Sequence, residues 1–405
     1  MSKRLLSILL AAALVAALAA GAHAEVFRFG YAKGEKYRIL STVHETVLVN
    51  GRFSHEAEIL NKIAVEVTDA RGGSGAHSVL FQTSERAWGS RATYEWGEDY
   101  SSTFWRDGRG AYDIDGSLFM PVVRNVPLFP EGDVPVGGTW TAEGSEVHDL
   151  RRSFGVERPF GYPITVSYSY LRRETRDGID CAVIRISYTV FHKVSAMPRT
   201  TKTWPARVVG RSEQTYWWDI ANRRPVFDEE SFDFLFTLAS GDEVEYIGEA
   251  RGELIGAAPL DRAQVAEEIG NEIRRQGLEG TSVMAVPEGV TIVLEDVRFP
   301  PNSDQLLPRE QEKLRRIAAM LSKYPERDIL ITGHTARASG YTEKDYQDLS
   351  EMRAKAAADF LLALGARQPR QMTMRGMGAR VPVGDNSTEE GMKRNRRVEI
   401  TILEN

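Results

Sequence analysis

One stretch near the end of the sequence combines a loop and a helix that together could bind an ionic group. Residues 329–364 read as a short apolar strand, a glycine-containing loop, and an amphipathic helix that carries Arg353 early on its face. A second basic segment, Asn395-Arg396-Arg397, follows nearer the end of the chain. A guanidinium binds carboxylates through paired, charge-assisted hydrogen bonds. The chemistry that this stretch favours is therefore capture of an acidic group.

Patterns typical of catalysis or metal binding are not evident elsewhere. The first half has scattered histidines, none of them paired at metal-ligand spacing: His44, His55, His77, His148 and His192. We find no nucleophile elbow and no phosphate-binding loop. Cys181 is the only cysteine, which excludes an intramolecular disulfide, and its strand-like surroundings favour a small buried side chain. We expect a protein without a cofactor and without a metal, and not an enzyme.

Length and composition set the broad class. The 405 residues favour two or three domains, and the 42% hydrophobic and 27% charged content is that of an ordinary folded protein. A net charge of -6 gives no reason to expect nucleic acid as a partner.

The first residues predict export. Lys3-Arg4, an apolar run from Leu5 to Ala20 and the small-residue site Ala22-His23-Ala24 are typical of a signal peptide spanning residues 1–24. A retained anchor is disfavoured because the apolar run is short for a membrane span. We expect cleavage after Ala24 and a periplasmic protein, with an association with the outer membrane left open.

Residues 25–256 predict an all-β antiparallel domain that is a barrel, a half-barrel or a sandwich. Apolar and polar residues alternate along this segment, as strands require, and turn signals separate the runs. The turns are Asn50-Gly51, Asp115-Gly116, Asp177-Gly178 and Ser240-Gly241-Asp242. We interpret each as a hairpin.

Two further features of this half bear on its partners. An outer-membrane barrel needs an apolar outward face, and charges at Lys36, Arg38, His44 and Glu45 interrupt that face, which favours a soluble domain. The aromatic-rich segment 88–112 could present a platform for a glycan or an apolar ligand, but core packing is the favoured reading. An envelope protein is the other partner considered for this domain.

The pattern changes near Pro259. Residues 257–280 predict a helical connector or the first element of a second domain, and residues 281–405 alternate strand and helix signals in the order βαβαββ. Pro308 opens one helix, and Thr342 to Asp345 resembles a capping box for the next. This order predicts an α+β fold with helices on one face of a mixed sheet.

Residues 260–405 resemble the OmpA-like C-terminal domain, the peptidoglycan-associating module shared with the Pal and MotB families. The resemblance is carried by five motifs: Phe299-Pro300-Pro301-Asn302-Ser303, Thr332-Gly333-His334-Thr335, Leu349-Ser350-Glu351-Met352-Arg353-Ala354, Gly376-Met377-Gly378 and Asn395-Arg396-Arg397-Val398-Glu399-Ile400. It says nothing about the β half, which we do not recognise.

The resemblance implies a binding site for the diaminopimelate of a peptidoglycan stem peptide. Members of the family bind its carboxylate with an Arg, which matches Arg353, and its ammonium with an Asp, whose place is taken here by Ala336. Asp345 or Asp348 could supply the missing charge, although the favoured interpretation is that both are solvated carboxylates at a helix start. The implied site comprises Thr335, Ala336, Arg337, Leu349, Ser350, Arg353, Asn395 and Arg397.

These observations lead to one expected function and one alternative. We expect a periplasmic envelope protein whose OmpA-like domain associates non-covalently with peptidoglycan, with binding weakened or altered by Ala336. The alternative is that the β domain binds a ligand or a protein, while the OmpA-like domain is a structural module that no longer binds peptidoglycan.

Overall fold

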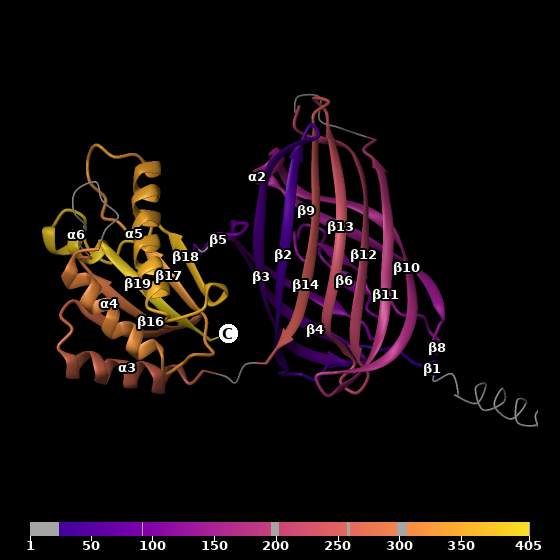
Figure 1. Ribbon diagram of the computed structural model, residues 1–405, viewed down its shortest axis with the longest axis horizontal. Coiled ribbons are helices and arrows are strands. Elements are labelled where there is room, and N and C mark those ends of the chain that lie inside the picture. Colours follow the sequence, from indigo (N-terminus) through magenta and orange to yellow (C-terminus); the bar gives the residue numbers. More distant parts are fainter. Residues whose placement is uncertain (1–23, 91, 196–201, 257–259, 298–305, 405) are drawn as a thin grey trace, which may run out of the picture.

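The computed structural model describes residues 24–90, 92–195, 202–256, 260–297 and 306–404, which form two domains of different architecture (Figure 1). The predicted signal peptide lies outside these residues except for Ala24, and so does the motif from Phe299 to Ser303. The fold class expected from the sequence is confirmed: an antiparallel β domain precedes an α+β domain. Among the described residues, no helix is both long and apolar enough to cross a membrane.

The first domain is one large, strongly curved antiparallel sheet. Its strands are ordered β6-β5-β4-β3-β2-β14-β13-β12-β11-β10-β9-β7, and in the part of the chain described, β5 and β9 do not pair with each other. Of the three architectures that the sequence left open, the structure therefore has a sheet that does not close. The strands are β2 (Lys36–Val49), β3 (Arg52–Arg71), β4 (Ser74–Ala87), β5 (Tyr94–Arg106), β6 (Tyr112–Ile114), β7 (Val123–Arg124), β9 (Thr139–Leu150), β10 (Val156–Arg176), β11 (Ile179–Lys193), β12 (Pro205–Asp219), β13 (Arg224–Leu238) and β14 (Glu243–Ile255).

Three of the four predicted hairpins are present. Asn50-Gly51 joins β2 to β3 and Asp177-Gly178 joins β10 to β11, and all four residues have positive φ, as a tight primed turn requires. The turn at residues 240–242 joins β13 to β14. The prediction at Asp115-Gly116 is wrong: β6 ends at Ile114 and a loop continues to β7, while Asp115 Oδ1 accepts a hydrogen bond from the backbone N–H of Ser117.

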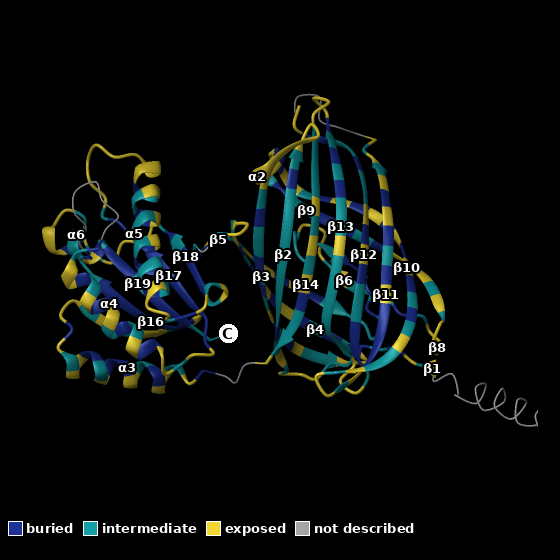
Figure 2. Cartoon of the chain, in the orientation of Figure 1, coloured by how far each residue is buried: buried dark blue, intermediate teal, exposed yellow. Residues whose placement is uncertain are grey.

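The concave side of the sheet holds the core of this domain. Buried and more exposed residues alternate along much of β4 and β10, as the two faces of a strand require, and Figure 2 shows such changes of burial along the strands. Phe27 and Phe29, which follow β1 (Ala24–Glu25), and Phe129, which precedes β8 (Val134–Pro135), belong to this core and contact Trp218 of β12 edge-to-face. The short helix α2 (Arg151–Phe154) connects β9 to β10.

The strand register corrects one sequence interpretation. Glu45 was counted among the charges of the outer face, but it lines an interior cavity, while its neighbour His44 lies on the outside against Trp88 with ring centroids 3.7 Å apart. The alternating faces of β2 place consecutive residues on opposite sides of the sheet, and the sequence alone could not say which side is which.

The aromatic residues of segment 88–112 have separate partners. Tyr94 is buried beneath Arg86, the ring of Trp96 lies 4.7 Å from the Arg375 guanidinium, and that of Trp105 lies 4.5 Å from Arg71. Packing and cation–π contacts within the protein therefore occupy these rings.

The second domain is a five-stranded mixed sheet with helices packed on it. The strand order is β15-β16-β19-β17-β18, with β17 and β18 parallel and the other pairs antiparallel. Helix α3, in the range predicted as a connector, contributes Val265, Ile269 and Ile273 to the core. Strand β15 and helix α6 have no counterpart in the predicted order. The elements are α3 (Arg262–Gln276), β15 (Thr281–Val286), β16 (Gly289–Glu295), α4 (Pro308–Leu321), β17 (Ile329–Gly333), α5 (Glu343–Ala363), η1 (Pro369–Gln371), β18 (Met372–Gly376), α6 (Glu389–Asn395) and β19 (Arg397–Leu403).

The two domains are joined through their sheets. The first residues of β5 pair in parallel with β18, with Tyr94 opposite Thr373 and Glu95 opposite Met374. This contact extends the small sheet by one strand of the large domain, as seen between the two domains in Figure 1. An exposed strand edge is a natural site for such pairing, because its N–H and C=O groups need partners.

Candidate functional site

Helix α5 lies directly on the backbone of the two parallel strands. A Cβ atom at Gly333 of β17 would lie 2.0 Å from the carbonyl oxygen of Ser350, and one at Gly376 of β18 would lie 2.4 Å from the Ser350 hydroxyl. Ser350 is fully buried, and its hydroxyl accepts a hydrogen bond of 2.8 Å from the backbone N–H of Gly378. The two glycines and the Ser350 hydroxyl set the distance between α5 and the sheet. They thereby also set the position of Arg353, which lies about one helical turn after Ser350.

The Arg353 guanidinium reaches the loop that follows β17. Its Nη1 donates a hydrogen bond of 3.2 Å to the carbonyl oxygen of His334, whose own N–H donates to the carbonyl oxygen of Arg397. Burial, together with the positive charge of Arg396, lowers the pKa of Arg353 to about 10, while the charge of Asp296 opposes this shift. Arg353 is therefore a charged group at neutral pH, held in a poorly solvated place.

The carboxylate that acts on Arg353 is Asp296, a residue that the sequence interpretation missed. Asp296 follows β16 in a left-handed conformation with φ 49°, and its Oδ1 also accepts hydrogen bonds of 3.3 Å from Arg396. Arg396 in turn donates to Glu389, 2.9 Å away. No local motif marks Asp296, because its role depends on β16 and α6 lying side by side in space.

The loop after His334 contains no acidic side chain in the segment from Thr335 to Gly340. Thr335 is buried and its N–H donates to the carbonyl oxygen of Gly378, while its hydroxyl has no hydrogen-bond partner among the described residues. Ala336 is half-buried and presents only a methyl group. Arg337 is exposed and pairs with Glu343 at 2.6 Å. The loop therefore offers no carboxylate for an ammonium.

The two aspartates considered as replacements are engaged elsewhere. Asp345 closes the capping box of α5: its Oδ2 accepts 2.7 Å hydrogen bonds from the N–H and the hydroxyl of Thr342. Asp348 pairs with Lys344 at 2.6 Å, one helical turn away. Both carboxylates are exposed, as expected for side chains in the first turns of a helix.

The remaining predicted site residues differ in how deeply they are buried and in what they contact. Asn395 is fully buried and its amide bridges the N–H groups of Val383 and Gly384, at 2.7 and 2.8 Å. Arg397 is also buried, and its Nε donates to Glu399 at 2.7 Å. Leu349 is half-buried on α5. Asn395 and Arg397 hold the loops around the site, while Arg353 and Ser350 of α5 meet His334 and Gly333 at the end of β17.

The features expected to be inert are a cysteine and the scattered histidines. Cys181 is buried, and burial raises the pKa of its thiol to about 11, so little thiolate forms at neutral pH. Within the described ranges, no three His, Cys, Asp or Glu side chains are arranged to hold a metal ion.

The segment that contains β17 and α5 matches a known protein family. Residues 298–396 match the OmpA family. This part of the chain is an OmpA domain. This chain is 34% identical over 131 residues to the probable lipoprotein YiaD of Escherichia coli, covering 32% of this chain and 58% of that protein.

This chain is also similar to proteins from other bacteria. It is 35% identical over 106 residues to the peptidoglycan-binding protein ArfA of Mycobacterium tuberculosis, covering 26% of this chain and 32% of ArfA. The chain thus spans less than two thirds of either relative. The structure of the cell wall anchor of the T6SS from Pseudomonas aeruginosa is 30% identical, with a TM-score of 0.30, covering 35% of this chain and 99% of that one.

Proposed function

We propose that the OmpA domain holds this protein to peptidoglycan without a covalent bond, and that Arg353 binds a carboxylate of the stem peptide. The observation that carries the proposal is the position of Arg353, half-buried at the end of β17 and anchored through His334. Arg396 adds a second positive charge nearby. A guanidinium in a poorly solvated place interacts with an anion more strongly than one in bulk water.

The proposed site differs from the pattern that the resemblance implies in its ammonium subsite. Position 336 is Ala, and both Asp345 and Asp348 are engaged in the helix start. Asp296 is the acidic group whose charge reaches Arg353. We infer that carboxylate capture dominates and that the free ammonium of a diaminopimelate contributes less, so binding is weaker than with an Asp at 336.

The proposed role is a structural one in the cell envelope, not an enzymatic one. ArfA is named as a peptidoglycan-binding protein and YiaD as a lipoprotein, and both match this chain through its OmpA domain. The signal peptide predicted from the sequence fits a periplasmic location for the domain, where peptidoglycan is accessible.

Sedimentation with purified sacculi tests this proposal. The mature wild-type chain should pellet with sacculi, and Arg353→Ala should lose at least about tenfold in affinity, as expected when a charged hydrogen bond is removed. Arg315→Ala is the matched control, because Arg315 is a half-exposed arginine on α4 that pairs within its own helix with Glu312. Equal binding of wild type and Arg353→Ala would overturn the assignment of Arg353.

The absence of a carboxylate at position 336 favours one alternative, in which the OmpA domain is only a structural module and the β domain binds the ligand. In that case the wild-type chain stays in the supernatant at every sacculus concentration, while folding normally by circular dichroism. The same assay therefore distinguishes the two functions.

A further inference from the structure

The β domain contains an interior cavity of about 370 Å³ near α2. Residues of β2, β7, β9, β11, β13 and β14 line it, together with Ser153 of α2. The cavity lies in the other domain from Arg353, so an inference about it is independent of the function proposed above. Its size is within the range of sites for small organic molecules.

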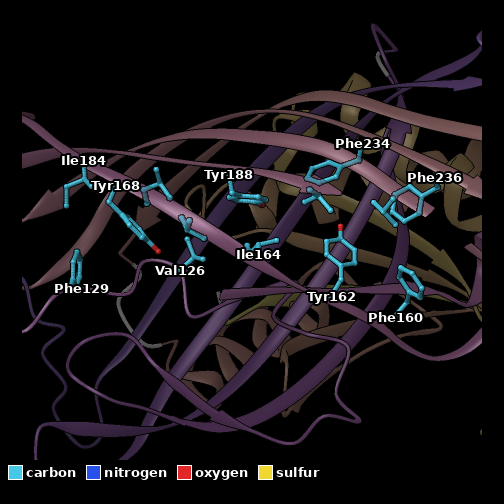
Figure 3. Packing of buried hydrophobic residues seen from close by; sticks show 14 of the residues in the cluster. Val126, Phe129, Phe160, Tyr162, Ile164, Tyr168, Ile184, Tyr188, Phe234 and Phe236 are labelled. Carbon is cyan, nitrogen blue, oxygen red and sulfur yellow. The ribbon is translucent and has the colours of Figure 1, made fainter. Parts of the chain in front are cut away.

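One wall of this cavity is aromatic. Phe232, Phe234 and Phe236 project from alternate positions of β13, and Tyr246 of β14 and Tyr188 of β11 complete the wall. Figure 3 shows the rings of Tyr188, Phe234 and Phe236 within the core cluster, with the hydroxyl of Tyr162 directed toward Phe234. Such a wall binds apolar groups and the faces of its rings attract cations.

Three carboxylates, those of Glu45, Glu146 and Glu230, line the same cavity. Glu146 of β9 is almost fully buried and is held as an anion, since it accepts hydrogen bonds from the hydroxyls of Tyr162 and Tyr188 and lies 2.8 Å from His148 Nε2. Although burial alone would raise the pKa of Glu146, these contacts lower it. A buried carboxylate with this many donors is a fixed negative charge in the wall of the cavity.

The other two carboxylates keep free acceptor capacity. Glu230 accepts hydrogen bonds at one oxygen only, from Ser212 and Gln214 at 2.6 and 3.1 Å. Glu45 has no hydrogen bond or ion pair among the described residues. Strand register places Glu45 at the level of Phe232, because both pair with Gly248. Glu230 lies two residues before Phe232, on the same face of β13.

The cavity has little compensating positive charge, and what there is comes from His148, which pairs with Glu146. None of its described lining residues is Lys or Arg, and His148 is the one basic side chain among them. The fourth lining carboxylate, Asp149, is paired with Arg151 at 2.5 Å. Negative potential beside an aromatic wall disfavours anions and complements a ligand that carries a positive charge on an apolar body.

We propose that this cavity binds a small organic cation, an amine carried on an apolar chain or ring, whose ammonium faces Glu45 and Glu230 and whose apolar part packs on the β13 aromatics. Desolvation of two partly satisfied carboxylates is then offset by the charge-assisted hydrogen bonds of the ligand. A ligand without a positive charge cannot offset this desolvation cost.

Calorimetric titration of the mature chain at pH 8 with hexylamine, hexanol and hexanoate tests the proposal, because these three probes share one chain length and differ in charge. Burial raises the pKa of Glu45 to about 7, so its carboxyl is ionised at this pH. Hexylamine should bind at least about tenfold more tightly than hexanol, the ratio expected for a charge-assisted contact, and hexanoate should not bind. Equal affinity for hexylamine and hexanol, or no hexylamine binding at millimolar concentration, would overturn it.

Two charge-removing variants locate the ammonium. Glu45→Gln and Glu230→Gln keep the side-chain shape, and at least one should weaken hexylamine binding by about tenfold. Glu229→Gln is the control, since Glu229 precedes Glu230 on β13 but pairs outside with Arg251 at 3.7 Å. Wild-type affinity in both Gln variants would contradict the proposal, and the three-probe comparison on the wild type decides it if a variant does not fold.

Discussion

The ammonium of Lys62 in the β domain lies 3.0 Å from the carboxylate of Asp328, which precedes β17 in the OmpA domain. Both side chains are almost fully buried, and Arg38 approaches the same carboxylate at 3.8 Å. Together with the pairing of β5 and β18, this contact connects the two domains through groups that have lost their water. The domain junction is therefore part of the folded structure rather than a loose tether.

Removal of the Lys62 charge should destabilise the junction. In Lys62→Met the apolar stem is retained while Asp328 keeps its buried charge, and loss of one partner of a buried pair costs on the order of 3 kcal/mol. We expect a lower urea midpoint for the full chain, or an earlier first transition if the domains unfold separately. As a control, Lys344→Met removes an exposed helical pair, which should change stability by less than about 0.5 kcal/mol.

Restoring a carboxylate at position 336 should strengthen sacculus binding. Ala336→Asp places an acidic group on the loop beside Arg353, where an ammonium would otherwise have no partner, and we expect a gain of roughly tenfold. Ala338→Asp adds the same charge to the exposed part of the same loop and should leave binding unchanged. A gain of the same size in both variants would mean that loop charge alone, and not the position, controls binding.

Asn395 should be essential for the stability of the OmpA domain. Its side chain makes four hydrogen bonds, to Val383, to Gly384 twice and to Asn386, and it is fully buried. Asn395→Ala leaves buried backbone groups without partners, at a cost of about 2–4 kcal/mol in the free energy of unfolding. Chemical denaturation measures this loss. Asn271→Ala, on the exposed face of α3, should stay within about 0.5 kcal/mol of wild type.

Glu45 should make the stability of the β domain depend on pH. Burial, with a smaller effect from the charge of Glu85, raises the pKa of Glu45 from 4.5 to about 7. Between these values the folded state holds a proton that the unfolded chain has released, so this contribution to stability is complete below about pH 4.5 and is lost as the pH rises through about 7. Glu45→Gln mimics the protonated form at every pH.

Thermal melts of wild type and Glu45→Gln at pH 5 and pH 8 check this sign. The two proteins should be similar at the lower pH, and the variant should be more stable at the higher one by on the order of 1–3 kcal/mol. Parallel pH profiles for the two proteins would show that Glu45 titrates at its ordinary value.

Local signals were sufficient for most individual elements. Asn-Gly and Asp-Gly dipeptides force positive φ and so identify hairpins, as at Asn50-Gly51 and Asp177-Gly178. Helix α5 begins at its capping box, and the spacing from that box to Arg353 fixes which face the guanidinium occupies. The Asp115 turn shows the limit of this approach, because a turn residue does not reveal whether a strand follows.

The sequence by itself determined the fold class of the two halves, the OmpA resemblance and most strands and helices apart from β15 and α6, because each depends on neighbours along the chain. It also proposed Arg353 as the charged residue of the site. Only the tertiary structure decided that Asp296 acts on Arg353, that Asp345 caps its own helix, and that Glu45 and Glu230 share a cavity across β2, β14 and β13. These relationships depend on strand register and on the meeting of distant segments, and a shift of one residue would turn Glu45 to the outside.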